Sequence, residues 1–163
     1  MDLTTDVLIV GAGGGGAILG IALARKGIAN LVLEQAEGPP QGIRGEILQP
    51  NGQALLHKLG LLDRLPADAS KAVRLFHFRK SGGERLCTID YEMLPSPFNR
   101  ALVMWPNIVH TTVLDRLQEE SPQALRFNAK FLSLLRDGNK IVGAQAEIDG
   151  EPLQISARVV VGA

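Results

Sequence analysis

The order of apolar and polar positions predicts a strand, a helix and a second strand at the start of the chain. Val7 to Val10 form an unbroken apolar run, which is typical of a parallel strand buried on both faces, and residues 31–33 have the same character. Residues 14–26 between them carry mostly small and apolar side chains. Gly20 lies four positions after Gly16, so both occupy one helix face. The pattern therefore predicts a helix packed closely on a sheet.

Shorter elements follow Glu34 in the sequence. A loop over residues 38–42 leads to a helix that begins at Pro50 and ends at Gly60. A further helix is expected after Asn107, which suits the N-cap position. Strands are expected at 72–78 and 85–90 as a hairpin, at 101–105, 125–135, 141–148 and 153–157, and at Val159 to Val161. The last run, which has no alternation, predicts an interior strand that lies beside the first strand and is buried on both faces.

The first turn carries the chemistry that the pattern suggests. It reads Gly11-Ala12-Gly13-Gly14-Gly15-Gly16, a G-x-G-x-x-G arrangement between a strand and a helix. Gly11 permits the tight turn, Gly13 lets a pyrophosphate approach the backbone, and Gly16 lets the helix pack close to the strand. The helix then presents free N–H groups and its positive dipole end. These features favour a dinucleotide-binding unit over a flexible glycine loop.

Glu34 ends the second predicted strand, about 20 residues after the turn, where a carboxylate accepts hydrogen bonds from an adenosine ribose. A negative charge at this position would repel a 2′-phosphate, which argues against NADP in this pocket. Glu34 therefore completes the predicted nucleotide site.

Composition bounds the possible functions. With 163 residues, 45% of them hydrophobic, the chain fits a single soluble α/β domain. Lys+Arg and Asp+Glu both number 17, so the net charge favours neither nucleic acid nor a membrane surface. Only residues 1–6 precede the first strand and no apolar run approaches membrane-spanning length. We therefore expect no signal peptide, no transit segment and no integral membrane segment.

Cysteine and histidine usage points away from metal and thiol chemistry. Cys87 is the only cysteine, which excludes an internal disulfide and a cysteine zinc cluster, and a cytoplasmic setting is the default. Its alternating surroundings predict a small buried hydrophobe rather than a nucleophile. His110 is expected to be a surface or packing histidine. Because no metal-ligand pattern, Ser-His-Asp arrangement or carboxylate pair appears, no metal site is predicted.

Three stretches together resemble the FAD-dependent aromatic hydroxylases, flavoprotein monooxygenases similar to para-hydroxybenzoate hydroxylase. The first is the glycine turn with Gly20, Gly27 and Glu34. The second is Arg44-Gly45-Glu46-Ile47-Leu48-Gln49-Pro50, followed by Leu59-Gly60-Leu61-Leu62-Asp63. The third is Ile141-Val142-Gly143 with Val159-Val160-Val161-Gly162-Ala163. In the family, an Asp-Gly that contacts FAD usually follows this last strand. The resemblance covers residues 1–163 but only the N-terminal part of a typical member.

The resemblance implies an α/β fold: a Rossmann-like FAD-binding domain over residues 1–163, with a central parallel sheet, helices and an added β-meander. The domain would be incomplete, since the substrate domain and the remaining FAD contacts are absent. The glycines of the turn (Gly11, Gly13, Gly14, Gly15 and Gly16) would hold the FAD pyrophosphate, and Glu34 would hold the ribose. Arg44 would contact FAD from the loop after the second strand, because its fork binds phosphate and ribose oxygens well.

The implied activity is hydroxylation of a small aromatic, usually phenolic, substrate with NAD(P)H and O₂. The chemistry would belong to the flavin, so no catalytic residue is assigned in this chain, and the isolated chain is expected to be inactive. Many members carry Pro-Ala where this chain has Gly14-Gly15, and many place a Gln or Arg near residues 106–107. Two alternatives stay open: another FAD oxidoreductase of this fold (geranylgeranyl-reductase-like or halogenase-like), or a non-catalytic nucleotide-binding fragment.

Overall fold

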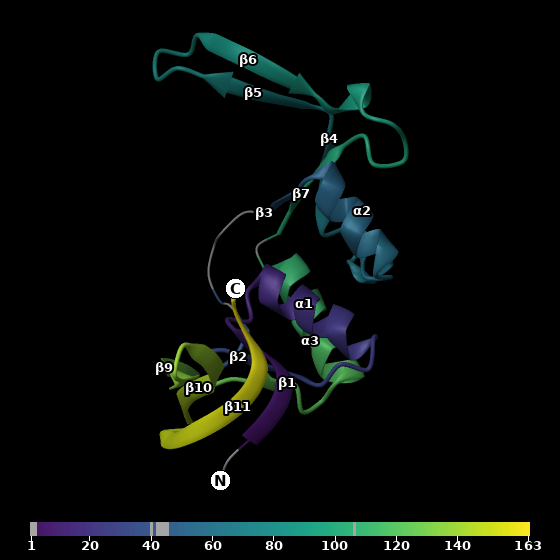
Figure 1. Ribbon diagram of the computed structural model, residues 1–163. Coiled ribbons are helices and arrows are strands. Elements are labelled where there is room, and N and C mark those ends of the chain that lie inside the picture. Colours follow the sequence, from purple (N-terminus) through teal and green to yellow (C-terminus); the bar gives the residue numbers. More distant parts are fainter. Residues whose placement is uncertain (1–2, 40, 42–45, 106) are drawn as a thin grey trace. The chain divides into compact units, whose positions relative to one another are not determined.

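The computed structural model describes residues 3–39, 41, 46–105 and 107–163 (Figure 1). They form two compact units. The first comprises Met1–Pro40 with Val109–Ala163, and the second comprises Gln41–Ile108. Two segments far apart in the sequence thus build the first unit.

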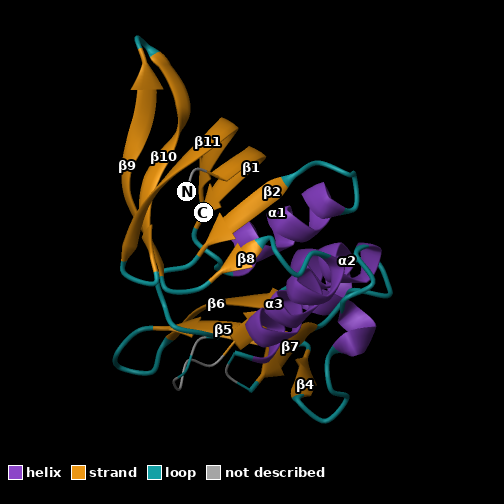
Figure 2. Cartoon of the chain, turned by 90° about the horizontal axis from the view of Figure 1, so that it is seen from below, coloured by secondary structure: helices purple, strands orange, loops and turns teal. Residues whose placement is uncertain are grey.

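A six-stranded sheet forms the centre of the first unit, in the order β8-β2-β1-β11-β10-β9 (Figure 2). β1 pairs in parallel with β2 and β11, β8 extends the parallel part beyond β2, and β10 and β9 add antiparallel strands at the other edge. The strands are β1 (Leu3–Val10), β2 (Asn30–Leu33), β8 (Leu125–Arg126), β9 (Ala129–Asp137), β10 (Lys140–Ile148) and β11 (Glu151–Gly162). This confirms the predicted α/β fold with a central parallel sheet and an added β-meander.

Two helices, α1 (Gly14–Ala24) and α3 (Ile108–Glu120), lie beside each other in the first unit (Figure 1). A Cβ placed on Gly20 of α1 would meet the side chains of Val32 at 3.0 Å and Leu117 at 3.1 Å. The small face predicted for this helix therefore allows close packing against both β2 and α3. Val32 and Leu117 are fully buried in this contact.

An ion pair joins the C-terminal ends of the two helices. The Arg25 guanidinium donates from Nη2 to Glu120 Oε1 at 2.6 Å and from Nε to Oε2 at 2.8 Å, and Arg116 also donates to Glu120. The hydrogen bond from Arg25 lowers the pKa of the Glu120 carboxyl below its ordinary value, although partial burial opposes this. The pair fastens α1 to α3 at the end of the helices remote from the glycine turn.

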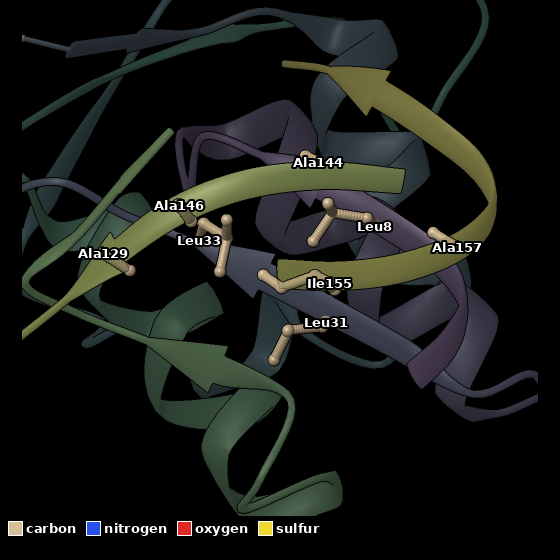
Figure 3. Packing of buried hydrophobic residues seen from close by; sticks show 8 residues of the cluster. All are labelled: Leu8, Leu31, Leu33, Ala129, Ala144, Ala146, Ile155 and Ala157. Carbon is tan, nitrogen blue, oxygen red and sulfur yellow. The ribbon is translucent and has the colours of Figure 1, made fainter. Parts of the chain in front are cut away.

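The opposite face of the sheet packs against the meander (Figure 3). Side chains alternate along a strand, so neighbouring residues of β1 serve different layers. Leu8 lies in the meander-side cluster, whereas Ile9 pairs with Val32 and lies on the same helix-side face. Both β1 residues are fully buried, at 0% exposure. The cluster consists of Leu8, Leu31, Leu33, Ala129, Ala144, Ala146, Ile155 and Ala157. The buried alanines are small enough to bring β10 close to the parallel strands.

The last strand confirms one prediction and corrects two. Val159 to Val161 do lie beside β1. They belong, however, to one continuous strand with residues 153–157, because β11 pairs with β10 through its first half and with β1 as it continues. The prediction that these valines are buried on both faces was also wrong, since Val159 is 51% exposed. α1 packs over β1 and β2, which leaves the helix-side face of β11 less covered.

The second unit holds two small antiparallel sheets, a β3-β7-β4 sheet and a β5-β6 hairpin. Its strands are β3 (Glu46–Leu48), β4 (Ser70–Val73), β5 (Leu75–Arg79), β6 (Arg85–Asp90) and β7 (Ala101–Met104). Its helices are α2 (Pro50–Lys58) and two single 3₁₀ turns, η1 (Leu62–Arg64) and η2 (Tyr91–Met93). The predicted hairpin is therefore present.

Two expectations for this unit were wrong. The strand predicted over 72–78 is split at Arg74, because β4 pairs with β7 whereas β5 pairs with β6. At the break, the Arg74 carbonyl accepts a hydrogen bond from the Tyr91 N–H at 3.0 Å, and its side chain donates to Asp90. Cys87 is exposed rather than buried, because both faces of the β5-β6 hairpin are largely open within the described residues.

Candidate functional site

The carboxyl ends of the parallel strands converge at one edge of the sheet in the first unit. The Gly11 N–H donates to the Leu33 carbonyl at 2.8 Å, and the Ala163 N–H donates to the Val10 carbonyl at 2.9 Å. The Glu34 N–H donates to the Arg126 carbonyl at 2.8 Å. Ligands of open α/β sheets bind outside such an edge. The predicted site residues Gly11 and Glu34 therefore occupy the position where a ligand is expected.

Two glycines of the turn are required by close backbone packing. Gly11 has φ +108°, and a Cβ there would lie 2.1 Å from the Ala163 carbonyl oxygen. A Cβ on Gly16 would lie 2.0 Å from the Gly11 carbonyl oxygen. Larger residues at either position would push the backbone apart. These two glycines thus set the path of the chain from β1 into α1.

The glycines between them face open space. For Gly13, Gly14 and Gly15, no heavy atom of the described residues, apart from the adjoining backbone, lies within 4 Å of the Cβ position. Gly14 and Gly15 are exposed. The loop therefore leaves room for a group to approach the backbone closely.

The start of α1 offers donors toward this open side. Gly13 is the N-cap residue, and its carbonyl accepts from the Ala17 N–H at 3.0 Å. Within the described part of the chain, no side chain caps the helix and no acidic residue occupies its first turn. Helix geometry leaves the first N–H groups without intrahelical partners, and the dipole favours an anion there. A phosphate group fits this arrangement.

Glu34 lies beside the glycine turn and is half-buried. Its Oε2 accepts from the Ala12 N–H at 3.0 Å, and its Oε1 accepts from the Ala36 N–H at 3.0 Å. Each carboxylate oxygen can accept more than one hydrogen bond, so capacity remains for a hydroxyl donor. The carboxylate thus both orders the turn and presents acceptors.

A pocket of about 230 Å³ opens next to this carboxylate. Its lining consists of Ala12, Glu34, Ala36, Gly38, His110, Leu114 and Phe127. A larger hollow of about 450 Å³ lies at the amino ends of β1 and β2, yet its lining contains none of the predicted site residues. The smaller pocket is the better candidate, because it sits at the carboxyl edge of the sheet.

His110 reaches the same turn from the first turn of α3. Its Nε2 lies 2.6 Å from the Ala12 carbonyl oxygen, and the ring lines the pocket. Sequence reasoning did not place this residue at the site. The only available signal was its position near the start of a helix that follows a strand. Arg44 lies outside the described residues, so its predicted contact stays a prediction.

The described ranges contain neither a candidate metal site nor a candidate membrane-spanning helix. No group of three or more His, Cys, Asp or Glu side chains is arranged there to hold a metal ion. No helix within those ranges combines the length and the apolar character needed to cross a bilayer.

The strand–turn–helix geometry, the open glycines and the terminal carboxylate define a dinucleotide-binding βαβ unit. Residues 4–163 match the model of the FAD-binding domain family, described as "FAD binding domain", and this chain belongs to that family. The match confirms the resemblance to flavoprotein monooxygenases on which the sequence interpretation relied.

Two curated relatives illustrate the range of the family. The chain is 32% identical over 162 residues to 6-methylpretetramide 4-monooxygenase from Streptomyces rimosus, covering 98% of this chain and 38% of that protein. It is 41% identical over 99 residues to squalene epoxidase 5 from Arabidopsis thaliana, covering 60% of this chain and 19% of that protein. The chain therefore spans well under half the length of either relative.

Solved structures share the fold. p-Nitrophenol 4-monooxygenase PnpA from Pseudomonas putida DLL-E4 superposes with a TM-score of 0.83 at 22% identity, covering 100% of this chain and 41% of that one. The myxobacterial chondrochloren halogenase CndH gives a TM-score of 0.82 at 23% identity, covering 99% of this chain and 37% of that one. At these identities the likeness shows the fold alone.

Proposed function

We propose that this chain is the FAD-binding part of a flavin-dependent monooxygenase that hydroxylates a small aromatic substrate with NAD(P)H and O₂. The observation that carries the proposal is the open Gly13–Gly15 backbone beside the Glu34 carboxylate, in a chain of the FAD-binding domain family. The aromatic substrate is supported by the relative that acts on 6-methylpretetramide, which aligns over 98% of this chain.

The residues of the turn fit the pyrophosphate of FAD. The backbone at Gly13, Gly14 and Gly15 would approach the phosphates, since no neighbouring side chain fills the space. The N–H groups at the start of α1 would donate to the phosphate oxygens. Gly11 and Gly16 would act indirectly, by holding the turn in this path.

Glu34 fits the adenosine ribose. Its two oxygens, already bonded to the N–H groups of Ala12 and Ala36, keep lone pairs for ribose hydroxyls. The adjoining pocket gives the nucleoside room. A 2′-phosphate would meet the negative charge of this carboxylate, so we propose that any NADPH used by the protein binds elsewhere. Arg44 would add a contact from the loop after β2.

When bound, FAD would supply the electron transfer and the oxygen chemistry, which amino-acid side chains cannot. The chain's own residues bind the cofactor and orient it. We assign no catalytic residue among them, and we propose that the substrate site lies outside residues 1–163. The protein that contains this chain is proposed to act in the cytoplasm.

The first experiment tests the cofactor. The longer protein that contains residues 1–163 is purified, mixed with FAD and freed of unbound flavin, and the absorbance spectrum is recorded. We expect retained flavin with perturbed absorbance bands. A colourless protein that also fails to quench flavin fluorescence would contradict the cofactor assignment.

The second experiment tests the reaction in the longer protein that contains this chain. NADH and NADPH oxidation are followed with a panel of phenols under ¹⁸O₂, and products are analysed by mass spectrometry. Incorporation of one ¹⁸O atom into an aromatic ring is expected. Turnover by residues 1–163 alone would contradict the proposal that the substrate site lies elsewhere.

A second candidate is oxygenation of an isolated alkene. The observation that favours it is the 41% identity to squalene epoxidase 5, although over only 60% of the chain. The ¹⁸O₂ experiment separates the two when an alkene is added to the panel. An ¹⁸O-labelled epoxide, without ring hydroxylation of any phenol, would favour the epoxidase. Halide incorporation without labelled oxygen would instead favour a halogenase.

A further inference from the structure

His110 makes a directional contact with the backbone of the glycine turn. Its Nε2 lies 2.6 Å from the Ala12 carbonyl oxygen, and Ala12 is only 1% exposed. A carbonyl oxygen only accepts hydrogen bonds, so Nε2 must carry the proton in this contact. In the neutral ring this selects the Nε2–H tautomer and leaves Nδ1 without a proton.

Ala12 is thereby held through both of its peptide groups. Its N–H, in the Gly11–Ala12 peptide, donates to Glu34 Oε2 at 3.0 Å. Its carbonyl, in the Ala12–Gly13 peptide, accepts from His110. Two side chains, one directly after β2 and one on α3, therefore fix two successive peptide planes. The glycines that follow have no side chains that could add further contacts of this kind.

The second of these planes determines where a ligand-facing donor points. The Ala12–Gly13 peptide is trans. In a trans peptide the C=O and N–H groups point in opposite directions. A carbonyl aimed at α3 therefore aims the Gly13 N–H away from α3, on the part of the turn where the Cβ position of Gly13 is open.

We propose that His110 is a positioning residue for the dinucleotide site. By holding the Ala12 carbonyl, it sets the direction of the Gly13 N–H before the pyrophosphate arrives. This inference rests on the proposed function, because it takes the open side of the turn to be the FAD site. It assigns His110 an effect on cofactor affinity through the backbone, without contact between its ring and the phosphates.

Glutamine and asparagine variants distinguish the hydrogen bond from packing. The amide nitrogen of glutamine can occupy about the position of histidine Nε2 and donate to Ala12, whereas the shorter asparagine cannot reach it. His110→Phe keeps a ring but has no donor. His77→Asn, on β5 in the second unit, is a control for replacing an exposed histidine. All four variants are made in the longer protein that contains residues 1–163.

The first measurement is FAD affinity by flavin fluorescence quenching. One neutral hydrogen bond corresponds to about a 5- to 10-fold change in Kd. We expect His110→Asn and His110→Phe to weaken FAD binding by about this factor, His110→Gln to stay within about 2-fold of the wild type, and His77→Asn to have no effect. A glutamine variant as weak as the phenylalanine variant would overturn the proposal. So would wild-type affinity in the asparagine variant.

The second measurement does not need bound FAD. Long-range ¹H–¹⁵N spectra of the His110 ring should place its proton on Nε2, and the Gly13 amide signal should shift in the asparagine variant but not in the glutamine variant. A proton on Nδ1, or an unmoved Gly13 signal, would overturn the proposal. If the wild type fails to bind FAD, the proposed function falls, and these spectra still decide whether His110 orients the turn.

Discussion

The Glu34 carboxylate accepts a hydrogen bond from the Ala12 N–H at 3.0 Å, across 22 positions of sequence. The end of β2 is thereby tied to the turn that follows β1. The same carboxylate accepts from the Ala36 N–H, so its two oxygens serve two segments. Glu34, which the sequence predicted only as a ligand contact, therefore also stabilises the glycine turn.

Glu34→Ala should weaken FAD binding by about 1.5–3 kcal/mol, the order of a hydrogen bond to a charged group. It should also lower the thermal stability of the apoprotein, because two backbone N–H groups lose their acceptor. Titration calorimetry and thermal unfolding measure the two effects. Glu37→Ala, at an exposed acid three positions later, is the matched control and should change neither. Unchanged FAD affinity in Glu34→Ala would contradict the ribose role.

Gly16→Ala and Gly15→Ala should have opposite effects on stability. The first places a Cβ 2.0 Å from the Gly11 carbonyl oxygen, so the backbone must shift, and we expect a loss of at least about 2 kcal/mol. The second meets open space and replaces a glycine within α1, which should stabilise by up to about 1 kcal/mol. Urea unfolding of both variants tests the pair. Equal stabilities would show that the backbone contact is unimportant.

Acid should remove the stabilisation that the Arg25–Glu120 pair provides. The hydrogen bond from Arg25 lowers the pKa of Glu120 in the folded state. The stabilising contribution is therefore fully present above the ordinary carboxyl pKa of about 4.3 and is lost as the pH falls through the lower folded value. With the Arg25 side chain 33% exposed, we expect Glu120→Gln to cost only about 0.5–1 kcal/mol at pH 7.

The measurement is urea unfolding of Glu120→Gln and the wild type between pH 7 and pH 3. The difference between them should shrink below about pH 4.3. Glu119→Gln, at a 49% exposed carboxylate 3.4 Å from Arg116, should cost less at pH 7. A difference that grows toward acid pH would reverse the sign assigned to this pair.

Gln53→Leu should destabilise the second unit. The Gln53 side chain is 5% exposed, and its Nε2 donates to the Leu48 carbonyl at 3.0 Å and to the Arg100 carbonyl at 2.7 Å. Leucine has a similar size but leaves both carbonyls without this donor, so we expect a loss of about 2 kcal/mol by thermal unfolding. Asn51→Leu, at an exposed position of α2, is the control. Equal stability of the two variants would refute the role of Gln53 in joining these segments.

The glycine turn was predictable from sequence because its physics is local. The strand before Gly11, the small residues after Gly16 and the acid at Glu34 each have one favoured place in a βαβ unit, and the structure has β1, α1 and β2 in that order. For the same reason the sequence located α2, which ends at Lys58 and is followed by Gly60, whose φ of +62° suits a residue without a side chain.

Properties that depend on distant partners were harder to predict. The split at Arg74 follows from a change of pairing partner from β7 to β6, which no local pattern records. The exposure of Val159 depends on how far α1 extends over the sheet, and that of Cys87 on what covers the hairpin. His110 was missed because its contact is with a backbone carbonyl 98 positions away. The role of His110 depends on a contact that only the folded chain makes, so its neighbours in sequence do not reveal it.

The pairing of β1 with β11 also has a consequence for the order in which the chain can fold during synthesis. Leu3 pairs with Ile155 and Val10 with Gly162, so β1 cannot close this part of its ladder during synthesis until the distant strand β11 has been made. Residues 41–108 form a compact unit of their own and emerge much earlier. Pairings between distant segments are slow to form because loop closure costs entropy. The nascent chain should therefore complete the small sheets of residues 41–108 before it assembles the nucleotide edge.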